Sequence, residues 1–304
     1  MQNYHIYEAI GRGKHSVVYK GRKKKSIKYY AIKSVEKNQR ARVLQEVRTM
    51  HALDHDNILK FYAWYETQNH LWLVLEYCVG GDLLTILRQD VRLPEDAVHG
   101  FAVDLVTALS FLHSHGLVYC DLKPSNVLLD ENGHLKLGDF GLTRRVSGDV
   151  NNGAVASLPP AKRGTPAYMA PELFQQDGCH SACSDLYALG CCLYECLAGR
   201  PPFVSTSFQE LVNMVLYERP PPLPSNTSQE LNDLISQLLA KDPADRLQWD
   251  ELLKHPFWEE PWARDIMPKG GGPGGIQRKR PAPGSVDVTR LSQIVRTNRV
   301  KETE

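Results

Sequence analysis

The sequence predicts a bilobal α+β fold, in which a small β-rich lobe with one helix precedes a larger helical lobe. Three observations predict it. Short β-like runs fill residues 4–77, apolar side chains recur at helical spacing from residue 82 onward, and a Gly/Pro-rich stretch follows the last helical pattern. We therefore expect one domain over residues 4–258, with an N-terminal lobe of about 4–77 and a C-terminal lobe of about 78–258.

The N-terminal lobe contains five β-like runs that alternate with turn residues. In chain order they are YHIYEAIG, SVVYKGRK, YYAIKSV, ILKFYAWYE and HLWLVLEY. One helical pattern, ARVLQEVRTMHAL, lies between the third and the fourth run. These features predict a small sheet with a single helix.

The C-terminal lobe is dominated by helical patterns. In order they are LLTILRQDV, PEDAVHGFAVDLVTALSFLHSHG, SDLYALGCCLYECLAG, SFQELVNMVLYE and SQELNDLISQLLAKD. The longest apolar run, residues 186–199, is interrupted by Glu195 and is too short to span a bilayer. We therefore expect a buried helix there and no membrane span.

The last part of the chain has a different composition. Residues 259–284 are expected to be a linker, since 270–284 contain six Gly and three Pro around the basic QRKR. In the basic tail, residues 285–304, apolar side chains such as Val288 and Leu291 recur at helical spacing among arginines. Two interpretations stay open for this tail: a short amphipathic helix that docks on the domain or a partner, or a disordered segment.

Charge and composition exclude some classes of function. The 304 residues are 42% hydrophobic and 23% charged, which is enough to bury a full core. The net charge of +1 gives no general attraction to nucleic acid or to an acidic membrane. We therefore expect no nucleic-acid partner, and any partner must be recognised locally.

The seven cysteines do not form two matching CxxC pairs, so a zinc site is a weak interpretation. Four of them lie in or near the apolar run of the C-terminal lobe, where cysteine behaves as a small hydrophobic residue. Buried, reduced thiols suit a reducing compartment, and we expect the protein in the cytoplasm.

Two motifs in the N-terminal lobe point to phosphate binding. In GRGKHSVVYKG, Gly11 and Gly13 lie in a turn between two β-like runs, where backbone N–H groups can approach a phosphate. A plain hairpin turn would look the same. In AIK, Lys33 is followed thirteen residues later by Glu46 in the helical pattern, and such a pair suits a phosphate clamp. The alternative is two solvated surface charges.

The third motif is VYCDLKPSNVLL, residues 118–129. Asp121 and Asn126 have the spacing at which one side chain accepts a hydroxyl proton while the other holds a metal. Asp139-Phe140-Gly141 follows, and Ala170-Pro171-Glu172 comes after it. Each triplet alone is common, but all in this order on a β-rich then α-rich chain would rarely arise by chance.

Taken together, these motifs resemble those of the eukaryotic protein kinases, over residues 4–258. The resemblance implies the two-lobed kinase fold with ATP and Mg²⁺ between the lobes. For the nucleotide it implies that Gly11 and Gly13 cover the phosphates. The adenine would lie between Val18, Ala31 and Leu128. Leu75 would be the gatekeeper, and Glu76 and Cys78 would form the hinge.

The same resemblance implies the catalytic roles. Asp121 would be the base, and Lys123 would steady the γ-phosphate. Lys33, held by Glu46, would contact the α- and β-phosphates. The metal ligands would be Asn126 and Asp139.

Structural roles are implied as well. A core stack resting on Asp185 would be formed by Phe61, Met50, Phe140 and Tyr119. Glu172 and Arg246 would form a buried ion pair beneath the activation segment.

Two residues indicate the acceptor. Lys123 in DLKPSN together with Thr165 in GTPAYMAPE resembles the serine/threonine kinases, which implies a protein substrate with a Ser or Thr acceptor.

A narrower resemblance is carried by FYAWYETQNHLWLVLEYCVGGDL, YCDLKPSN and SDLYALGCCLYECLAGRPPF. These segments resemble the Unc-51-like kinases, in the branch of Fused, RUNKEL and Unc-51-like kinase four. That branch is associated with microtubule structures such as cilia, so the resemblance implies a microtubule-associated partner and a cytoskeletal or ciliary location.

The sequence departs from typical active kinases at two positions. Ser16 stands in place of the third glycine, and Cys120 stands where most kinases have arginine. For Cys120, a redox-sensitive thiol and a neutral packed cysteine are both considered, and the latter is favoured because Lys123 is the one adjacent cation evident. Two hypotheses for the whole chain therefore stay open: a working kinase, or a pseudokinase scaffold that binds nucleotide and a cytoskeletal partner without phosphoryl transfer.

Overall fold

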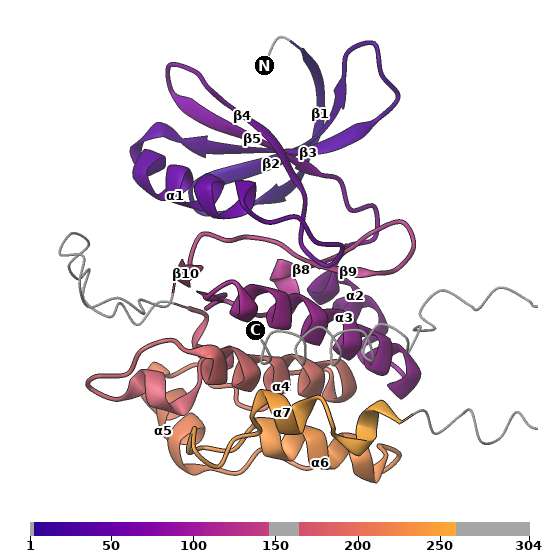
Figure 1. Cartoon of the computed structure of the whole chain (residues 1–304), viewed down its shortest axis with the longest axis vertical. Coiled ribbons are helices and arrows are strands. Elements are labelled where there is room, and N and C mark those ends of the chain that lie inside the picture. The colour runs from indigo at the N-terminus through magenta and orange to yellow at the C-terminus, as the bar shows by residue number, and fades with distance from the viewer. Residues whose placement is uncertain (1–2, 146–163, 260–304) are drawn as a thin grey trace, which may run out of the picture.

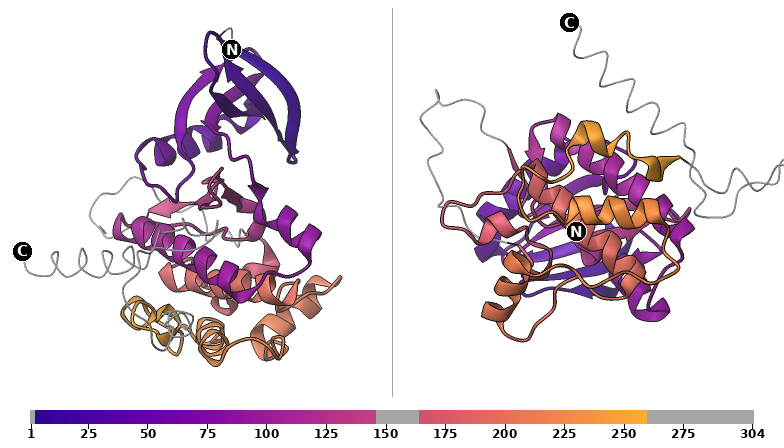
Figure 2. Two further views of the ribbon diagram at one scale, coloured as in Figure 1. Left: turned by 90° about the vertical axis from the view of Figure 1, so that its right-hand side faces the viewer. Right: turned by 90° about the horizontal axis from the view of Figure 1, so that it is seen from below.

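A computed structural model describes residues 3–145 and 164–259 (Figure 1). The expected tail, and the linker apart from residue 259, lie outside the described residues. The chain forms two lobes, a strand-rich N-terminal lobe and a helical C-terminal lobe, and the side view shows the first standing above the second (Figure 2). The predicted bilobal α+β fold is confirmed.

The N-terminal lobe is a five-stranded antiparallel sheet with strand order β1-β2-β3-β5-β4. One α-helix, α1 (Arg40–His51), lies against it and buries Val43, Glu46, Val47 and Met50. The five predicted runs correspond to the strands β1 (Tyr4–Arg12), β2 (Ser16–Lys23), β3 (Tyr29–Glu36), β4 (Phe61–Glu66) and β5 (His70–Glu76).

Side chains alternate between the two faces of this sheet, as the two-residue period of a strand requires. On β3, Ala31 and Val35 belong to the main hydrophobic core. Between them, Ile32 belongs to a separate cluster with Tyr30 and Val74, covered by partly buried aromatic residues. The lobe therefore buries apolar side chains on both faces of its sheet.

The C-terminal lobe contains helices where the sequence predicts them, and one short helix, α7, that the pattern did not indicate. Its helices are α2 (Leu83–Asp90), α3 (Glu95–Ser114), α4 (Ala182–Ala198), α5 (Phe208–Tyr217), α6 (Gln229–Leu238) and α7 (Trp249–Leu252). Helix α4 begins with a capping box between Ser181 and Ser184, and fourteen of its residues are buried. The expected buried helix over residues 186–199 is therefore confirmed.

Helix α3 is the second long helix of this lobe. Within the two described ranges it is the one helix long and apolar enough to cross a membrane by length and composition. However, 67% of the relevant window is buried inside the fold. Such burial is expected of a core helix.

Short strands join the lobes and position the loops between them. One small sheet has the order β6-β8-β9 and another pairs β10 with β7. Their strands are β6 (Gly81–Asp82), β7 (Leu117–Val118), β8 (Val127–Leu129), β9 (Leu135–Leu137) and β10 (Arg144–Arg145). The 3₁₀ turns are η1 (Lys37–Gln39), η2 (Pro124–Asn126), η3 (Pro166–Tyr168), η4 (Pro171–Phe174) and η5 (Pro256–Trp258).

All seven cysteines lie in the described ranges and are free thiols. Cys120, Cys191, Cys192 and Cys196 are buried, as expected, whereas Cys78 and Cys183 are half-buried and Cys179, in the loop before α4, is exposed. The expectation that the thiols are buried is therefore wrong for Cys179 and holds only in part for Cys78 and Cys183. Within the described part of the chain, no group of three or more His, Cys, Asp or Glu side chains could hold a metal ion.

Candidate active site between the lobes

A cavity of about 420 Å³ lies between the two lobes. The strands β1, β2, β3 and β5 line one side, and residues of the C-terminal lobe line the other. The cavity brings together most of the predicted site residues: Gly11, Gly13, Val18, Ala31, Lys33, Glu46, Leu75, Glu76, Cys78, Asn126, Leu128 and Asp139. Their roles stay predictions, but their common position is a structural observation.

Lys33 connects the two lobes at the back of this cavity. Its Nζ donates a hydrogen bond to Glu46 Oε1 at 2.7 Å and a longer one to Asp139 Oδ1 at 3.4 Å. Glu46 is only 4% exposed. Burial alone would lower the pKa of Lys33, but the Glu46 and Asp139 carboxylates outweigh it and raise that pKa above its ordinary value. The alternative of two solvated surface charges is therefore wrong.

Asp139 presents its carboxylate at the same place. The Lys33 ammonium, helped by the Gly141 backbone N–H and the Arg42 guanidinium, lowers the pKa of Asp139. Its backbone is in the left-handed region, with φ of 49°. Non-glycine residues adopt that region at a cost of about 1–3 kcal/mol, and such strain clusters at functional sites. Asp139 is therefore an ionised, fixed carboxylate in the cavity.

Asp121 lies at the centre of a second network. Lys123 Nζ donates to Asp121 Oδ2 at 2.8 Å and to Thr165 Oγ1 at 2.7 Å. Thr165 Oγ1 in turn donates to Asp121 Oδ1 at 3.2 Å. The lysine and the threonine, 42 residues apart in the chain, thus hold the two oxygens of one carboxylate.

Asn126 completes the network through its side-chain amide. Its amide Nδ2 donates to the Asp121 carbonyl oxygen at 2.9 Å and to Oδ2 at 3.0 Å. The amide oxygen of Asn126 is then available, and both Asn126 and Asp139 line the cavity. Amide and carboxylate oxygens are the ligands that Mg²⁺ prefers. The donor set of this cavity therefore fits Mg²⁺ held with a phosphate-bearing ligand.

The glycine turn, which connects β1 to β2, lines the cavity on the side of the N-terminal lobe. The Gly13 N–H donates to the Ser16 carbonyl at 2.8 Å, so the turn is a tight hairpin that also lines the cavity. A Cβ on Gly13 would lie 2.9 Å from Ser16 Oγ, closer than real Cβ atoms come. The turn is thus a tight hairpin beside the cavity, and its role in phosphate binding stays a prediction.

Below Asp121, the α4 residue Asp185 holds the loop from inside the core. Its carboxylate accepts hydrogen bonds from the backbone N–H groups of Tyr119 (2.8 Å) and Cys120 (2.9 Å). The Tyr119 ring packs edge-on against Phe140 with centroids 5.5 Å apart, and its hydroxyl donates to the Gly138 carbonyl. Met50 is buried in the same hydrophobic core, and the partly buried Phe61 packs against that core. The stack expected to rest on Asp185 thus includes a direct Tyr119–Phe140 contact.

Cys120 is a packed, neutral thiol. It is 6% exposed, and its Sγ lies 3.4 Å from the Val118 carbonyl oxygen. Burial raises the pKa of Cys120, against a smaller lowering by the nearby Arg144. The sequence interpretation gave Lys123 as the one adjacent cation and missed that Arg144 also lies near Cys120, because β10 pairs with β7. A strand of two residues has no periodicity that would have indicated this contact.

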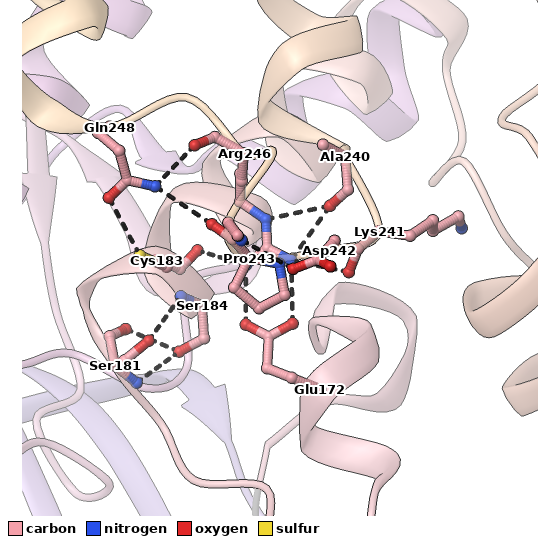
Figure 3. Close-up of polar contacts among 11 residues, drawn as sticks. Glu172, Ser181, Cys183, Ser184, Ala240, Lys241, Asp242, Pro243, Arg246 and Gln248 are labelled. Atoms are coloured by element: carbon pink, nitrogen blue, oxygen red, sulfur yellow. Dashed lines mark hydrogen bonds and ion pairs between the residues drawn. The ribbon is translucent and has the colours of Figure 1, made fainter.

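In the C-terminal lobe, Arg246 and Glu172 form the expected ion pair (Figure 3). Arg246 Nη1 and Nη2 contact the two Glu172 carboxylate oxygens at 2.7 and 2.9 Å. The guanidinium also donates to backbone carbonyls of Ala240 and Cys183. Because Arg246 is 1% exposed, this bidentate pair is part of the core.

Two further polar residues of the site region were not predicted. Arg42 lies one helical turn before Glu46 on α1, and the i, i+4 spacing could have indicated that both face Asp139. Glu195 of α4 is buried and accepts a hydrogen bond from the Tyr168 hydroxyl at 2.6 Å. Nothing in the local pattern around Glu195 indicates that contact, because it joins two segments distant in sequence.

Comparison with known proteins agrees with the family resemblance seen in the sequence motifs. The protein kinase domain family matches residues 4–258. The serine/threonine-protein kinase RUNKEL of Arabidopsis thaliana is 60% identical over 259 residues, which are 85% of this chain and 19% of RUNKEL. The serine/threonine-protein kinase ULK4 of Mus musculus is 43% identical over 283 residues, 86% of this chain and 22% of that protein. The serine/threonine-protein kinase fused of Drosophila melanogaster is 36% identical over 265 residues, 85% of this chain and 32% of that protein. The chain thus spans less than a third of the length of each of these relatives.

Proposed function

Because this chain belongs to the protein kinase family, in the Unc-51-like and Fused branch, we propose that it transfers the γ-phosphate of ATP to a serine or threonine hydroxyl of a protein. The observation that carries the proposal is that two charge networks lie next to each other: the first lines the cavity, and Asn126, which also lines it, donates to Asp121 of the second. One network joins Lys33, Glu46 and Asp139, and the other joins Asp121 to Lys123 and Thr165. Phosphoryl transfer depends almost entirely on such positioned charges.

The residues have distinct tasks in this proposal. Lys33, fixed by Glu46, compensates phosphate charge at the back of the cavity. Mg²⁺, when held by Asn126 and Asp139, supplies further neutralising charge to the phosphates. The oxygen of the substrate hydroxyl bonds to the γ-phosphorus, and the bond from that phosphorus to ADP breaks, so that ADP leaves. The Asp121 carboxylate accepts the proton that the hydroxyl loses. Lys123 holds Asp121 in place and adds positive charge beside the transferred group.

The contact between Lys123 and Thr165 supports a serine or threonine acceptor. The two residues were expected from sequence to mark that substrate class, and their side chains meet at 2.7 Å beside Asp121. The relatives are named serine/threonine-protein kinases, which agrees with this class.

The test is phosphorylation by the purified 304-residue chain with radiolabelled Mg-ATP. Peptide mixtures that present either Ser and Thr or Tyr as acceptor are compared, with an Asp121→Asn variant as the inactive control. We expect label on the Ser/Thr mixture alone, and loss of it in the variant. Label that persists in the variant would come from a contaminant and would remove the support for the proposal.

A second candidate is a pseudokinase scaffold that binds nucleotide without transferring phosphate. Two observations favour it: Ser16 stands in place of the third glycine of the turn, and Cys120 cannot make the ion pair that arginine makes in many kinases. Saturable binding of ATP, measured by calorimetry, together with no transfer to any acceptor would establish this candidate and reject the first.

The place of action is proposed to be a microtubule-based structure in the cytoplasm, with a microtubule-associated partner. Its support is the likeness to the Fused and RUNKEL branch. The test is cosedimentation of the chain with polymerised tubulin, with and without a cell extract that supplies partner proteins. Absence from the pellet in both conditions would contradict the proposal.

A further inference from the structure

Positive charge is concentrated in one stretch of the N-terminal lobe, although the net charge of the whole chain is close to zero. The whole sequence has 36 Lys and Arg against 35 Asp and Glu, but residues 9–35 contain nine Lys and Arg and no Asp or Glu. Five of the nine lie at the connection of β2 to β3, and we call them the basic hairpin surface: Arg22, Lys23, Lys24, Lys25 and Lys28. A local field of this kind is invisible in the net charge of +1.

This surface has no neutralising partner within the described ranges. None of its five cations forms an ion pair with a described carboxylate, whereas lysines elsewhere in the lobe do, such as Lys37 with Glu66 at 3.0 Å. Arg22 and Lys28 instead donate to tyrosine hydroxyls, those of Tyr7 (3.1 Å) and Tyr62 (3.0 Å). The positive charge is therefore available to a carboxylate from another molecule.

Aromatic side chains hold part of the surface in position. The Lys28 Nζ lies 4.7 Å from the ring centroid of Tyr62 and 5.7 Å from that of Tyr30. Tyr30 and Tyr62 pack edge to face with centroids 5.1 Å apart, over the buried Ile32 and Val74. An ammonium fixed before binding loses less conformational freedom when a partner arrives.

Three consecutive lysines of the surface, Lys23, Lys24 and Lys25, are exposed. Lys25 has φ of 60°, in the left-handed region that glycine or asparagine adopts more readily. The turn lies at the end of the small lobe away from the helical lobe (Figure 1), and none of the five cations lines the cavity between the lobes. The surface is thus separate from the proposed site of phosphoryl transfer.

We propose that the basic hairpin surface binds an extended, Glu- and Asp-rich segment of a partner protein. Four of its five cations are lysines, compact point charges that suit single carboxylates along a chain, whereas bidentate phosphate recognition favours arginine. The proposal holds for a working kinase and for a scaffold alike.

Two other macromolecules fit less well. Ile27, at 93% exposure, is the only large apolar side chain of the turn, which is too little apolar area to anchor the lobe in a bilayer. The rings of Tyr30 and Tyr62 contact each other and Lys28, so they are not free to stack with nucleic-acid bases.

The experiment measures fluorescence anisotropy of a labelled oligoglutamate peptide with the 304-residue chain at about 0.1 M salt. In the test variant, Lys23, Lys24 and Lys25 are all changed to Glu, and a milder variant changes them to Ala. The control variant changes Arg92, Arg219 and Lys254 to Glu, three exposed cations of the helical lobe, so that the net charge is the same. We expect binding to weaken at least about tenfold in the test variant and about threefold or less in the control, because nearby charges dominate within a Debye length of about 10 Å.

Further measurements distinguish the outcomes. Circular dichroism and thermal melting establish that each variant is folded. If the test variant is not folded, the alanine variant replaces it. Equal weakening in test and control variants would overturn the proposal, because net charge alone would then explain binding. Lysine-dependent binding to phosphatidylserine vesicles or single-stranded DNA without binding to oligoglutamate would also overturn it.

Discussion

The Asp185 carboxylate accepts a hydrogen bond from the backbone N–H of Cys120 at 2.9 Å, directly before the proposed base. Cys120 is held at φ of 71°, in the left-handed region. A non-glycine residue adopts this region at a cost of about 1–2 kcal/mol, so a buried acceptor must offset the strain. The orientation of Asp121 therefore depends on a carboxylate in the core of the helical lobe.

The first prediction concerns Asp185→Asn. The variant keeps the shape of the side chain but places an amide N–H group against backbone N–H donors, which leaves a buried donor without an acceptor. We expect a loss of stability of about 1–3 kcal/mol and at least a tenfold lower kcat, with little change in KM for ATP. Denaturant unfolding and steady-state kinetics check it. Wild-type kcat in the variant would show that the loop does not need this acceptor.

The second prediction concerns the charges around the phosphates. Lys33→Ala removes the ammonium that Glu46 and Asp139 hold, and Asp139→Asn removes a proposed Mg²⁺ ligand. We expect each change to lower transfer by roughly a hundredfold or more while the fold stays intact, because positioned charges in such sites stabilise the transition state strongly. Initial rates with Mg-ATP and melting curves are the measurements. A double variant that works at the wild-type rate would refute the enzyme proposal.

The third prediction concerns the buried ion pair. Glu172→Ala leaves Arg246 charged in the core with only backbone carbonyls as acceptors. We expect the free energy of unfolding to fall by about 3–5 kcal/mol, the typical effect of removing one partner of a buried pair. The matched control is Lys60→Ala, which breaks an exposed pair with Asp54 and should cost less than about 1 kcal/mol. Similar losses in both variants would contradict the burial argument.

The sequence predicts some of these contacts and not others for physical reasons. Lys33 and Glu46 were paired correctly because strand alternation and helical spacing each place a side chain on a known face. Only the family resemblance linked Lys123 with Thr165. No local sequence pattern indicates that these two residues, 42 positions apart, come into contact. Arg144 beside Cys120 was missed because the strand that carries it has only two residues.

The fourth prediction is a pH dependence that arises from Glu195. Burial raises the pKa of Glu195 above its ordinary 4.5, although the Tyr168 hydroxyl opposes this. The folded state therefore holds this proton more tightly than the unfolded state, so its stabilising contribution is complete below pH 4.5 and is lost as pH rises through the raised pKa.

Glu195→Gln mimics the protonated side chain at every pH and still offers the Tyr168 hydroxyl an acceptor oxygen. We expect the variant to gain stability relative to the wild type as pH rises from 4 toward neutrality. Denaturant titrations across about pH 4–7, where carboxylates titrate, check this. A difference in unfolding free energy that is constant with pH would show that Glu195 does not titrate on folding.

The last prediction concerns phosphorylation of the segment between Gly141 and Ala170. In many kinases the arginine before the catalytic aspartate pairs with a phosphate on this segment, which orders the segment. Here the position is Cys120, whose buried neutral thiol lies against the Val118 carbonyl and cannot make that pair. We therefore expect activity that does not require phosphorylation of Ser147 or Ser157, which lie outside the described residues.

Phosphatase treatment of the purified chain and the double change of Ser147 and Ser157 to Ala should both leave kcat unchanged. A further variant is Arg144→Ala, because Arg144 lies near the Cys120 thiol and carries a positive charge there. If phosphatase lowers kcat and rephosphorylation restores it, the chain has a phosphate switch despite Cys120. If the Arg144 variant then no longer responds to phosphatase, the switch works through Arg144, since a phosphate without its cation cannot order the segment.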